Sequence, residues 1–460
     1  MRLHTFTDDA LGDHDAVALA DLVARGERSP RELAEASLAR RAQAEGLDAV
    51  EVVLPEPRVS EAGRLRGVPT FLKDNVDVRG LPTGHGSEAF TGRRKSRNDP
   101  YVDQYLGTGL TLLGKSRLPE FGFNASTEFM TRPPVRNPWH TEHSVGASSG
   151  GAAALVAAGV VPIAHANDGG GSIRIPAACA GLVGLKPTRG RHVDAKLAKT
   201  LPINMVSEGV VTRSVRDTAH FVAAMEDVWR NPSLEPVGLV EGVADRTYRI
   251  GVLTETVNGA PVHPETQAAV DQVVRVLEKL GHEVEEVPLP VGPQFVEDFT
   301  LYWGLLATLS TTVGAPTFGF PFHQRRLDGL TKGLRGHHLK NVHRTPGALR
   351  RLKAVAATYD VTMAGFDAVV CPTLAHPAPR LGHLSPTQPF DELMLKLQQY
   401  VVTTPVHNIA GTPGLSMPVG LSTDGLPIGV HLSGTRGGER TLLELAYLIE
   451  AELPAPRIQE

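Results

Sequence analysis

Helix-like and strand-like segments alternate along most of the chain, and this alternation restricts the fold more than any other feature of the sequence. The clearest helix follows the capping box Ser29-Pro30-Arg31-Glu32, in which proline takes the first helical position. Periodicity predicts further helices at 264–280 and from about Arg440, and strands at 282–287, at 366–372 and as a pair within 415–432. Such a mixture predicts an α/β fold around a largely buried sheet.

The composition describes a globular protein that does not enter a membrane. Of 460 residues, 41% are hydrophobic, and the formal net charge is −4. The longest apolar stretch, residues 152–164, contains a glycine and a proline and is too short to span a bilayer. The first ten residues lack the apolar stretch of a secretory signal, and the two cysteines show no metal or disulfide spacing. We therefore expect a cytoplasmic protein.

One segment, residues 325–353, is strongly basic. It holds nine Lys or Arg residues and a single acid, Asp328, a pattern that can mark a nucleic-acid surface. No aromatic residue lies in this segment to stack on bases, which favours a solvated excursion instead. Its histidines, His337, His338 and His343, have no cysteines and few acids nearby, so surface histidines are favoured over a metal site. We expect neither nucleic acid nor metal as a partner.

Residues 109–116 fit the pattern G-x-x-x-x-G-K-[ST] of a phosphate-binding loop. Such a loop follows a strand and opens a helix. Here the intervening residues LTLL themselves resemble a buried strand, and Pro119 follows closely, so the nucleotide interpretation is disfavoured.

Residues 146–150, GASSG, fit the nucleophile elbow G-x-S-x-G of α/β-hydrolases. An elbow needs a strand directly before it, whereas the preceding NPWHTEHSV is polar and predicts irregular chain. Asp367 and His407 are candidate partners without a supporting local pattern. This interpretation is also disfavoured.

A second serine-containing loop, NDGGGSIR at residues 167–174, places Ser172 behind three glycines and 24 positions after Ser148. The apolar, helix-like AAALVAAGVV joins the two loops, so both could meet at the edge of one sheet. Upstream, Lys73 ends the apolar run of GVPTFLKDN. A lysine is normally exposed, but a buried one loses its charge more readily and can act as a base.

Together these stretches resemble the amidase signature family of serine hydrolases. The resemblance lies in GVPTFLKDN, GASSGG and DGGGSIRIP, and is supported by LLGKSRLPEFG, GLVGLKPTRGR and FDAVVCPTLAHPAP. It extends from about Val68 to Gly434. It implies a single amidase domain over 1–460, built on a central twisted mixed β-sheet covered by helices on both faces. Residues 60–220 would form the catalytic core, and about 291–358 a variable segment that shapes the substrate pocket.

By position, the resemblance implies a Ser-Ser-Lys triad. Ser172 would be the nucleophile, Ser148 a proton relay preceded by a cis peptide bond, and Lys73 the general base in its neutral form, because a serine hydroxyl is a weak nucleophile until a base removes its proton. No cofactor and no metal are implied. Two residues depart from the family pattern: Ala147 replaces a glycine, and Asn167 stands where threonine or serine is frequent.

The glycines before the nucleophile have an implied role as well. Backbone amides of Gly169, Gly170 and Gly171 would form an oxyanion hole, in which each donor contributes about 2.7–4 kcal/mol. Asp168 and Arg174 would brace this loop. For the variable segment we predict a hydrophobic acyl pocket, although aromatic residues in such a segment belong more often to the core than to a pocket: Tyr302, Trp303, Phe318 and Phe320.

The resemblance implies a hydrolase of carbon–nitrogen bonds other than peptide bonds. Its substrates would be small linear or cyclic amides, cleaved through an acyl-enzyme, with esters as a side activity. The wording around Ser172 is similar to amidases of the 6-aminohexanoate cyclic dimer hydrolase type, which act on nylon-related oligomers. The alternative is the glutamine-hydrolysing subunit of a tRNA-dependent amidotransferase, in which glutamine commonly follows the loop arginine, whereas Ile175 does here. A non-catalytic binding module is disfavoured because all triad positions are filled. The expected partner is a small-molecule amide; a homodimer is left open.

Overall fold

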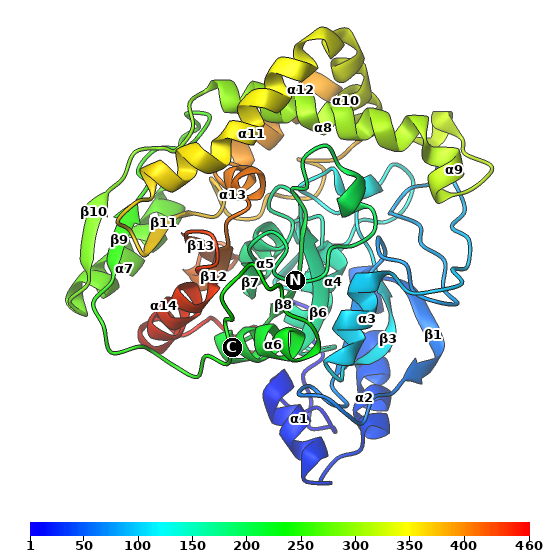
Figure 1. Cartoon of the computed structure of the whole chain (residues 1–460). Coiled ribbons are helices and arrows are strands. Elements are labelled where there is room, and N and C mark those ends of the chain that lie inside the picture. Colours follow the sequence, from blue (N-terminus) through cyan, green and yellow to red (C-terminus); the bar gives the residue numbers. More distant parts are fainter.

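A large mixed β-sheet forms the centre of the molecule, and the computed structural model describes residues 1–460 (Figure 1). Its eight strands lie in the order β10-β9-β11-β13-β12-β7-β8-β6. The strands β10, β9 and β11 are parallel, and every later neighbour is antiparallel. The strands are β6 (Ile163–Asp168), β7 (Val183–Lys186), β8 (Ser207–Thr212), β9 (Arg249–Val252), β10 (Glu283–Glu286), β11 (Ala368–Pro372), β12 (Gly414–Leu421) and β13 (Pro427–Ser433).

A three-stranded sheet, β1-β3-β2, lies beside the β6 edge of the large sheet. Side chains rather than a backbone ladder join β2 to β6: the Thr70 hydroxyl donates to the Ile163 carbonyl at 3.0 Å, and the Lys73 amide donates to Nδ1 of His165 at 3.1 Å. This contact brings the end of β2 against β6. The remaining strands are β1 (Val50–Arg58), β2 (Pro69–Lys73), β3 (Thr111–Ser116), and the hairpin β4 (Arg136–Asn137) and β5 (His140–Ser144).

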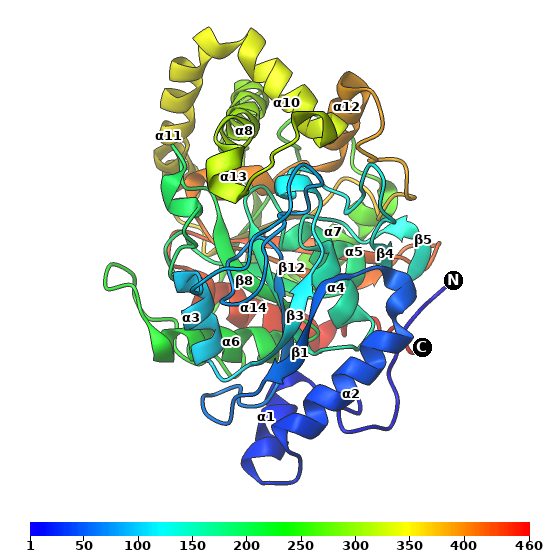
Figure 2. The same cartoon turned by 90° about the vertical axis from the view of Figure 1, so that its right-hand side faces the viewer.

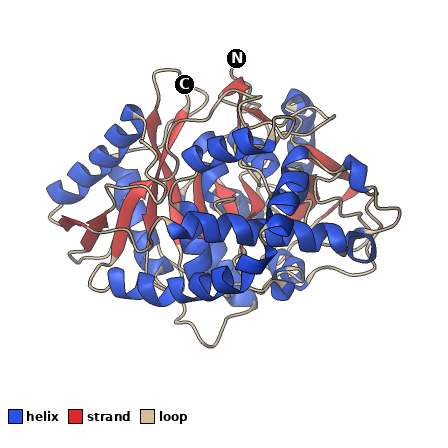
Figure 3. Cartoon of the chain, turned by 90° about the horizontal axis from the view of Figure 1, so that it is seen from above, coloured by secondary structure: helices blue, strands red, loops and turns tan.

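Helices cover both faces of the large sheet, as predicted (Figure 3). Alternate side chains of β11 explain why: Ala368 and Val370 pack with α6, α7 and α14, whereas Val369 and Cys371 pack with α5 and the helices above it. Both faces of this strand are therefore apolar. The helices are α1 (Ala16–Ala24), α2 (Pro30–Gln43), α3 (Pro100–Gly107), α4 (Gly150–Ala157), α5 (Arg174–Ala180), α6 (Val215–Val228), α7 (Pro264–Lys279), α8 (Gln294–Thr312), α9 (Gly314–Phe318), α10 (Gly329–Lys340), α11 (Thr345–Thr362), α12 (Phe390–Tyr400), α13 (Thr404–Ala410) and α14 (Glu439–Glu452).

Most local predictions agree with the structure. Ser29 caps α2 with the complete capping box, and residues 109–116 contain the strand β3 rather than a phosphate loop. Lys115 is buried there in an ion pair with Asp74. One local prediction was wrong, because the polar stretch before Gly146 is not irregular but forms the β4–β5 hairpin. Its polar side chains bond to loops around it, as when Ser144 Oγ accepts from the Gly146 amide at 3.0 Å.

Helices α8 to α11 form a layer above the sheet, which we call the cap, comprising residues 294–362 (Figure 2). The chain leaves the sheet after β10 to build the cap and returns at β11. The basic segment forms α10, α11 and their connections, and two of its arginines pair with acids of α8: Arg344 with Glu297, and Arg351 with Asp298, both at 2.6 Å. His338 is not the surface residue that the sequence suggested, because it is buried against α8 and bonds to Thr308 at 2.9 Å.

None of these helices combines the length and the apolar character that crossing a membrane requires.

Candidate active site

Three segments that are distant in sequence bring the predicted triad together. Lys73 ends β2, Ser148 lies in the turn that leads into α4, and Ser172 lies in the loop between β6 and α5. Helix α4 begins here because Gly150 and Gly151 pack where no larger side chain fits: a Cβ on Gly150 would lie 2.1 Å from the Thr127 hydroxyl. The closely packed α4 therefore fixes the turn that carries Ser148.

Lys73 is fully buried and has no carboxylate in direct contact. Its Nζ lies 2.7 Å from Ser148 Oγ, 3.0 Å from Ser149 Oγ and 2.7 Å from Asn167 Oδ1. Burial disfavours the charged form and lowers the pKa of Lys73 to about 7, against the opposing charges of Glu208 and Asp168. A lysine with this pKa is partly neutral at physiological pH and can accept a proton.

Asp74 and Asp77 follow Lys73 closely in the sequence and would favour its charged form if they pointed toward it. Instead, Asp74 pairs with Lys115, and Asp77 pairs with Lys95 at 3.1 Å. Each of these acids is thus paired with another lysine, and desolvation is the largest effect on the pKa of Lys73.

Ser148 follows a cis peptide bond from Ala147, as the family pattern implied. Its hydroxyl also lies close to Gly122, where an added Cβ would be 3.0 Å from Ser148 Oγ. Ser148 and Ser172 line one cavity, but no hydrogen bond joins their hydroxyls. Catalytic hydrogen bonds commonly tighten only when substrate is bound.

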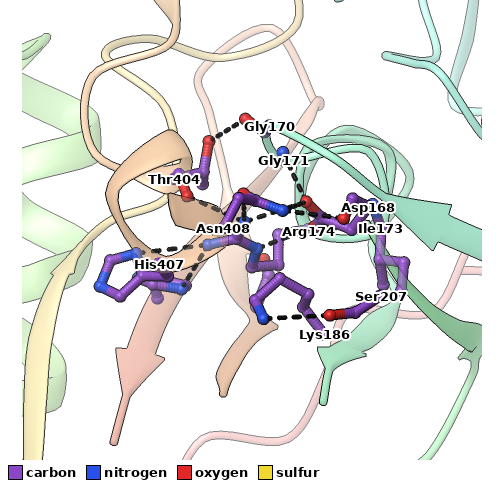
Figure 4. Close-up of polar contacts among 12 residues, drawn as sticks. Asp168, Gly170, Gly171, Ile173, Arg174, Lys186, Ser207, Thr404, His407 and Asn408 are labelled. Carbon is purple, nitrogen blue, oxygen red and sulfur yellow. Dashed lines mark hydrogen bonds and ion pairs between the residues drawn. The ribbon is translucent and has the colours of Figure 1, made fainter. Parts of the chain in front are cut away.

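An acid–guanidinium pair underlies the loop that carries Ser172 (Figure 4). Both oxygens of Asp168 accept bonds from the Arg174 side chain, at 2.9 and 3.0 Å, and both residues are fully buried. The guanidinium holds the pKa of Asp168 well below its usual range. Asn408 adds bonds to both partners from α13, at 2.9 Å to Asp168 and 2.7 Å to Arg174. This network supports the predicted bracing role.

Gly171 does not have the predicted role of an oxyanion-hole donor. Its amide donates to Asp168 Oδ1 at 2.6 Å and is therefore not available to an oxyanion. Its φ of 133° and the Thr404 hydroxyl, 2.5 Å from the position of a Cβ, explain the glycine. The amides of Gly169, Gly170 and Ser172 have no partner within the chain. These three amides are the candidates for an oxyanion site.

A cavity of about 770 Å³ lies between the cap and the serine loops. Helix α8 provides much of an apolar wall, and the Phe299 ring lies 3.4 Å from where a Cβ on Gly170 would be. Of the four aromatic residues singled out from sequence, Trp303 and Phe318 line the cavity. Tyr302 does not, because its hydroxyl bonds to the Ile203 backbone, and Phe320 is exposed. The apolar lining includes Met205, Val206, Phe295, Phe299, Trp303, Leu306, Met394, Leu397 and Val406.

The cavity also differs in extent from the predicted pocket segment. Within residues 291–358, the lining ends at Phe318, and the second half of the segment does not reach the cavity. Further walls come from residues 195–206, from α12 and from α13, which sequence reasoning missed. It also missed Ser149, Asn408, and the buried pair His165–Glu208, which have no local pattern that sets them apart.

The chain is similar to known proteins along most of its length. Residues 36–443 match the family model described as Amidase. The chain is 46% identical over 466 residues to a Mycobacterium leprae protein named "Putative amidase AmiC", covering 100% of this chain and 99% of that protein. It is 32% identical to 6-aminohexanoate-cyclic-dimer hydrolase of Paenarthrobacter ureafaciens, over 96% of this chain and 95% of that protein. A solved structure of 6-aminohexanoate cyclic dimer hydrolase superposes with a TM-score of 0.88 at 29% identity, covering 99% of this chain and 100% of that one.

Proposed function

The chain belongs to the amidase signature family, hydrolases of amide carbon–nitrogen bonds, and from that premise we propose that it cleaves small neutral amides through a Ser-Ser-Lys triad. The observation that carries this proposal is the environment of Lys73: a fully buried lysine whose Nζ lies 2.7 Å from Ser148 Oγ, with its pKa lowered to about 7 by burial. Two other buried lysines have different contacts: Lys115 pairs with Asp74, and Nζ of Lys186 bonds to the Pro187 carbonyl and to Ser207, which does not line the cavity.

In the proposed reaction, neutral Lys73 takes the proton of Ser148, which takes the proton of Ser172. The Ser172 oxygen attacks the amide carbonyl, and the negative charge that forms on the carbonyl oxygen is met by the amides of Gly169, Gly170 and Ser172. The proton returns through Ser148 to the leaving amine, and water then hydrolyses the acyl-enzyme.

The cavity supports a substrate with an apolar acyl group. The walls next to Gly169 and Gly170 are Val206 and Phe299, so the group attached to the carbonyl carbon meets hydrophobic side chains. We propose linear, cyclic or aryl amides of this kind, with nylon-type oligomers among the candidates and esters as a side activity.

The test is turnover by the purified chain alone on a panel of linear, cyclic and aryl amides, with matching esters and with glutamine. We expect release of amine from neutral amides without any added protein. If glutamine is the sole substrate, and only when partner subunits of a tRNA-dependent amidotransferase are present, the amidase proposal fails in favour of that alternative.

A further inference from the structure

A buried carboxylate beside the triad has no role in the reaction described so far. Glu208, on β8, is 4% exposed, and its charge acts on Lys73. Its two oxygens have different partners: Oε2 lies 2.9 Å from Nε2 of His165, and Oε1 lies 3.4 Å from Nδ2 of Asn167. Both partners lie on β6, the strand that also contacts β2, so Glu208 acts on the catalytic lysine through two neighbours.

The ring of His165 has a defined proton position. Its Nδ1 accepts from the backbone amide of Lys73 at 3.1 Å, so the ring proton must be on Nε2. Nε2 then donates to Glu208. Burial lowers the pKa of His165, which keeps the ring neutral and this tautomer fixed.

The side-chain amide of Asn167 is oriented in turn. Since a carboxylate only accepts hydrogen bonds, the atom of Asn167 that faces Glu208 must be the NH₂ group. The amide oxygen therefore faces Lys73, and Nζ donates to it at 2.7 Å.

Ser149 supplies a second acceptor. Its hydroxyl donates to the Asn167 carbonyl at 3.3 Å, which uses its only proton, so at Nζ of Lys73, 3.0 Å away, it can only accept. A neutral lysine has two N–H bonds and one lone pair. With both N–H bonds directed to Asn167 and Ser149, the lone pair is left for the third neighbour, Ser148.

We propose that Asn167, held by Glu208, which His165 holds in turn, is a positioning residue that directs the lone pair of neutral Lys73 toward the hydroxyl of Ser148. This inference rests on the proposed function and adds the means by which its base is oriented. As the Ser148 O–H bond breaks, a new N–H bond forms on Lys73, while Ser148 receives the proton of Ser172.

Glu208 has an electrostatic effect as well. It and Asp168 are the negative charges that raise the pKa of Lys73 against desolvation. Replacing Glu208 by Gln removes one of them, so the pKa of Lys73 falls and the rise of acylation with pH moves to lower pH. The glutamine side chain has one acceptor oxygen, whereas both His165 and Asn167 donate to this side chain. The orientation of the Asn167 amide is then no longer fixed. Besides His165 and Lys73, the charge of Glu208 acts on Asp99, Tyr101 and Asp194, and Nδ1 of His192 lies 2.9 Å from the Glu208 backbone carbonyl.

The test is single-turnover acylation as a function of pH in wild type, Asn167→Leu, Asn167→Thr and Glu208→Gln. Leucine keeps the size of asparagine but cannot accept from Lys73, and threonine restores a hydroxyl acceptor. We expect Asn167→Leu to lower the alkaline plateau by about 100-fold with little change in KM, and Asn167→Thr to recover most of the loss. A residue that merely tuned the pKa would move the pH midpoint and leave the plateau, where the lysine is already neutral.

An unchanged plateau in Asn167→Leu overturns the positioning role. If that variant does not fold, Glu208→Gln decides: a lower plateau with a more acidic midpoint supports the inference, and a wild-type plateau overturns it. Wild-type turnover of amides separates this result from the function itself. If wild type cleaves no amide and a fluorophosphonate does not label Ser172, the proposed function fails and the inference with it.

Discussion

The rate of acylation should rise with pH in a single step, which we call the basic limb and which reflects the loss of the proton from Lys73. Because burial lowers its pKa to about 7, the neutral fraction, and with it the rate, should rise through that pH and level off above it. Lys73→Ala should remove the limb and slow amides by about 10²–10⁴-fold, and esters less, because an amine leaving group needs the returned proton. The measurement is single-turnover acylation of a matched amide and ester across pH.

Lys115→Met is the control, because this lysine is also buried but pairs with Asp74 outside the triad. We expect the limb to persist in any Lys115→Met protein that folds. Equal losses for amide and ester in Lys73→Ala would assign the base to another group.

Ser172 should be the residue that forms the acyl-enzyme. Ser172→Ala removes the attacking oxygen while the Asp168–Arg174 network beneath the loop stays intact, so the protein should fold and bind amides without acylation. Mass spectrometry after fluorophosphonate treatment should find the adduct on the peptide that contains Ser172. An adduct on Ser148, in a variant that is still active, would revive the nucleophile-elbow interpretation.

At this scale the sequence predicts the residues of the proposed triad and the pair Asp168–Arg174, but not Glu208 and His165, which lie beside them. Lys73, Ser148 and Ser172 lie in motifs whose glycines and spacing are visible in one dimension. Glu208 is a single acid within SEGVVT, and its partners lie about 40 residues away on another strand. Only pairing of β6 with β8 places it beside the lysine. Gly171 shows the same limit, since the loss of its amide to Asp168 depends on how the loop closes.

Among the elements, helix α8 should determine how large an acyl group the cavity accepts. Phe299 lies over Gly170, so Phe299→Ala opens space directly beside the carbonyl carbon of a bound substrate. We expect the ratio of kcat/KM for a bulky acyl group to that for an acetyl group to rise about tenfold, the scale of one or two methylenes in a hydrophobic pocket. The measurement is kcat/KM for a series of anilides that differ in acyl length.

Phe322→Ala provides the matched control, because that ring packs on Phe90 and does not line the cavity. It should leave the ratio unchanged. The same ratio in Phe299→Ala and wild type would mean that the acyl group occupies another part of the cavity.

The elements differ in how far sequence predicts them. Helix α2 begins with a capping box, α7 has regular hydrophobic periodicity, and β11 is a short apolar run, so local patterns suffice for these three elements. The hairpin β4–β5 has no apolar alternation, because its polar side chains bond to loops packed around it. The walls of the cavity outside α8 likewise depend on long-range packing of α12 and α13.

At the scale of the whole molecule, the basic segment should have little part in catalysis on neutral amides. Arg344 and Arg351 are matched by acids of α8, whereas Arg325, Arg326 and Arg350 point to solvent. Replacing these three exposed arginines by Gln should leave turnover of neutral amides within about twofold, because exposed charges at a distance are screened by salt. Arg351 should stay, since its loss leaves Asp298 buried without its partner.

The check compares wild type and this triple variant at low and at moderate ionic strength, in turnover and in binding to an unrelated nucleic acid. Tight, salt-dependent binding by wild type that the variant loses would assign the segment to a nucleic-acid surface.

The cap has a consequence for how such a protein can be diversified. It occupies one uninterrupted stretch, 294–362, whereas the three residues of the proposed triad come before it in the chain. Exchanging this stretch for that of a relative needs just two crossover points in the gene. The residues of the proposed triad then all come from the recipient. Such a chimera must preserve the apolar contact between the two parts, in which Leu306, Leu352 and Tyr359 of the cap pack in one cluster with residues of the sheet and of α5. It must also keep the hydrogen bonds of Tyr302 to the Ile203 backbone, at 2.6 and 3.0 Å.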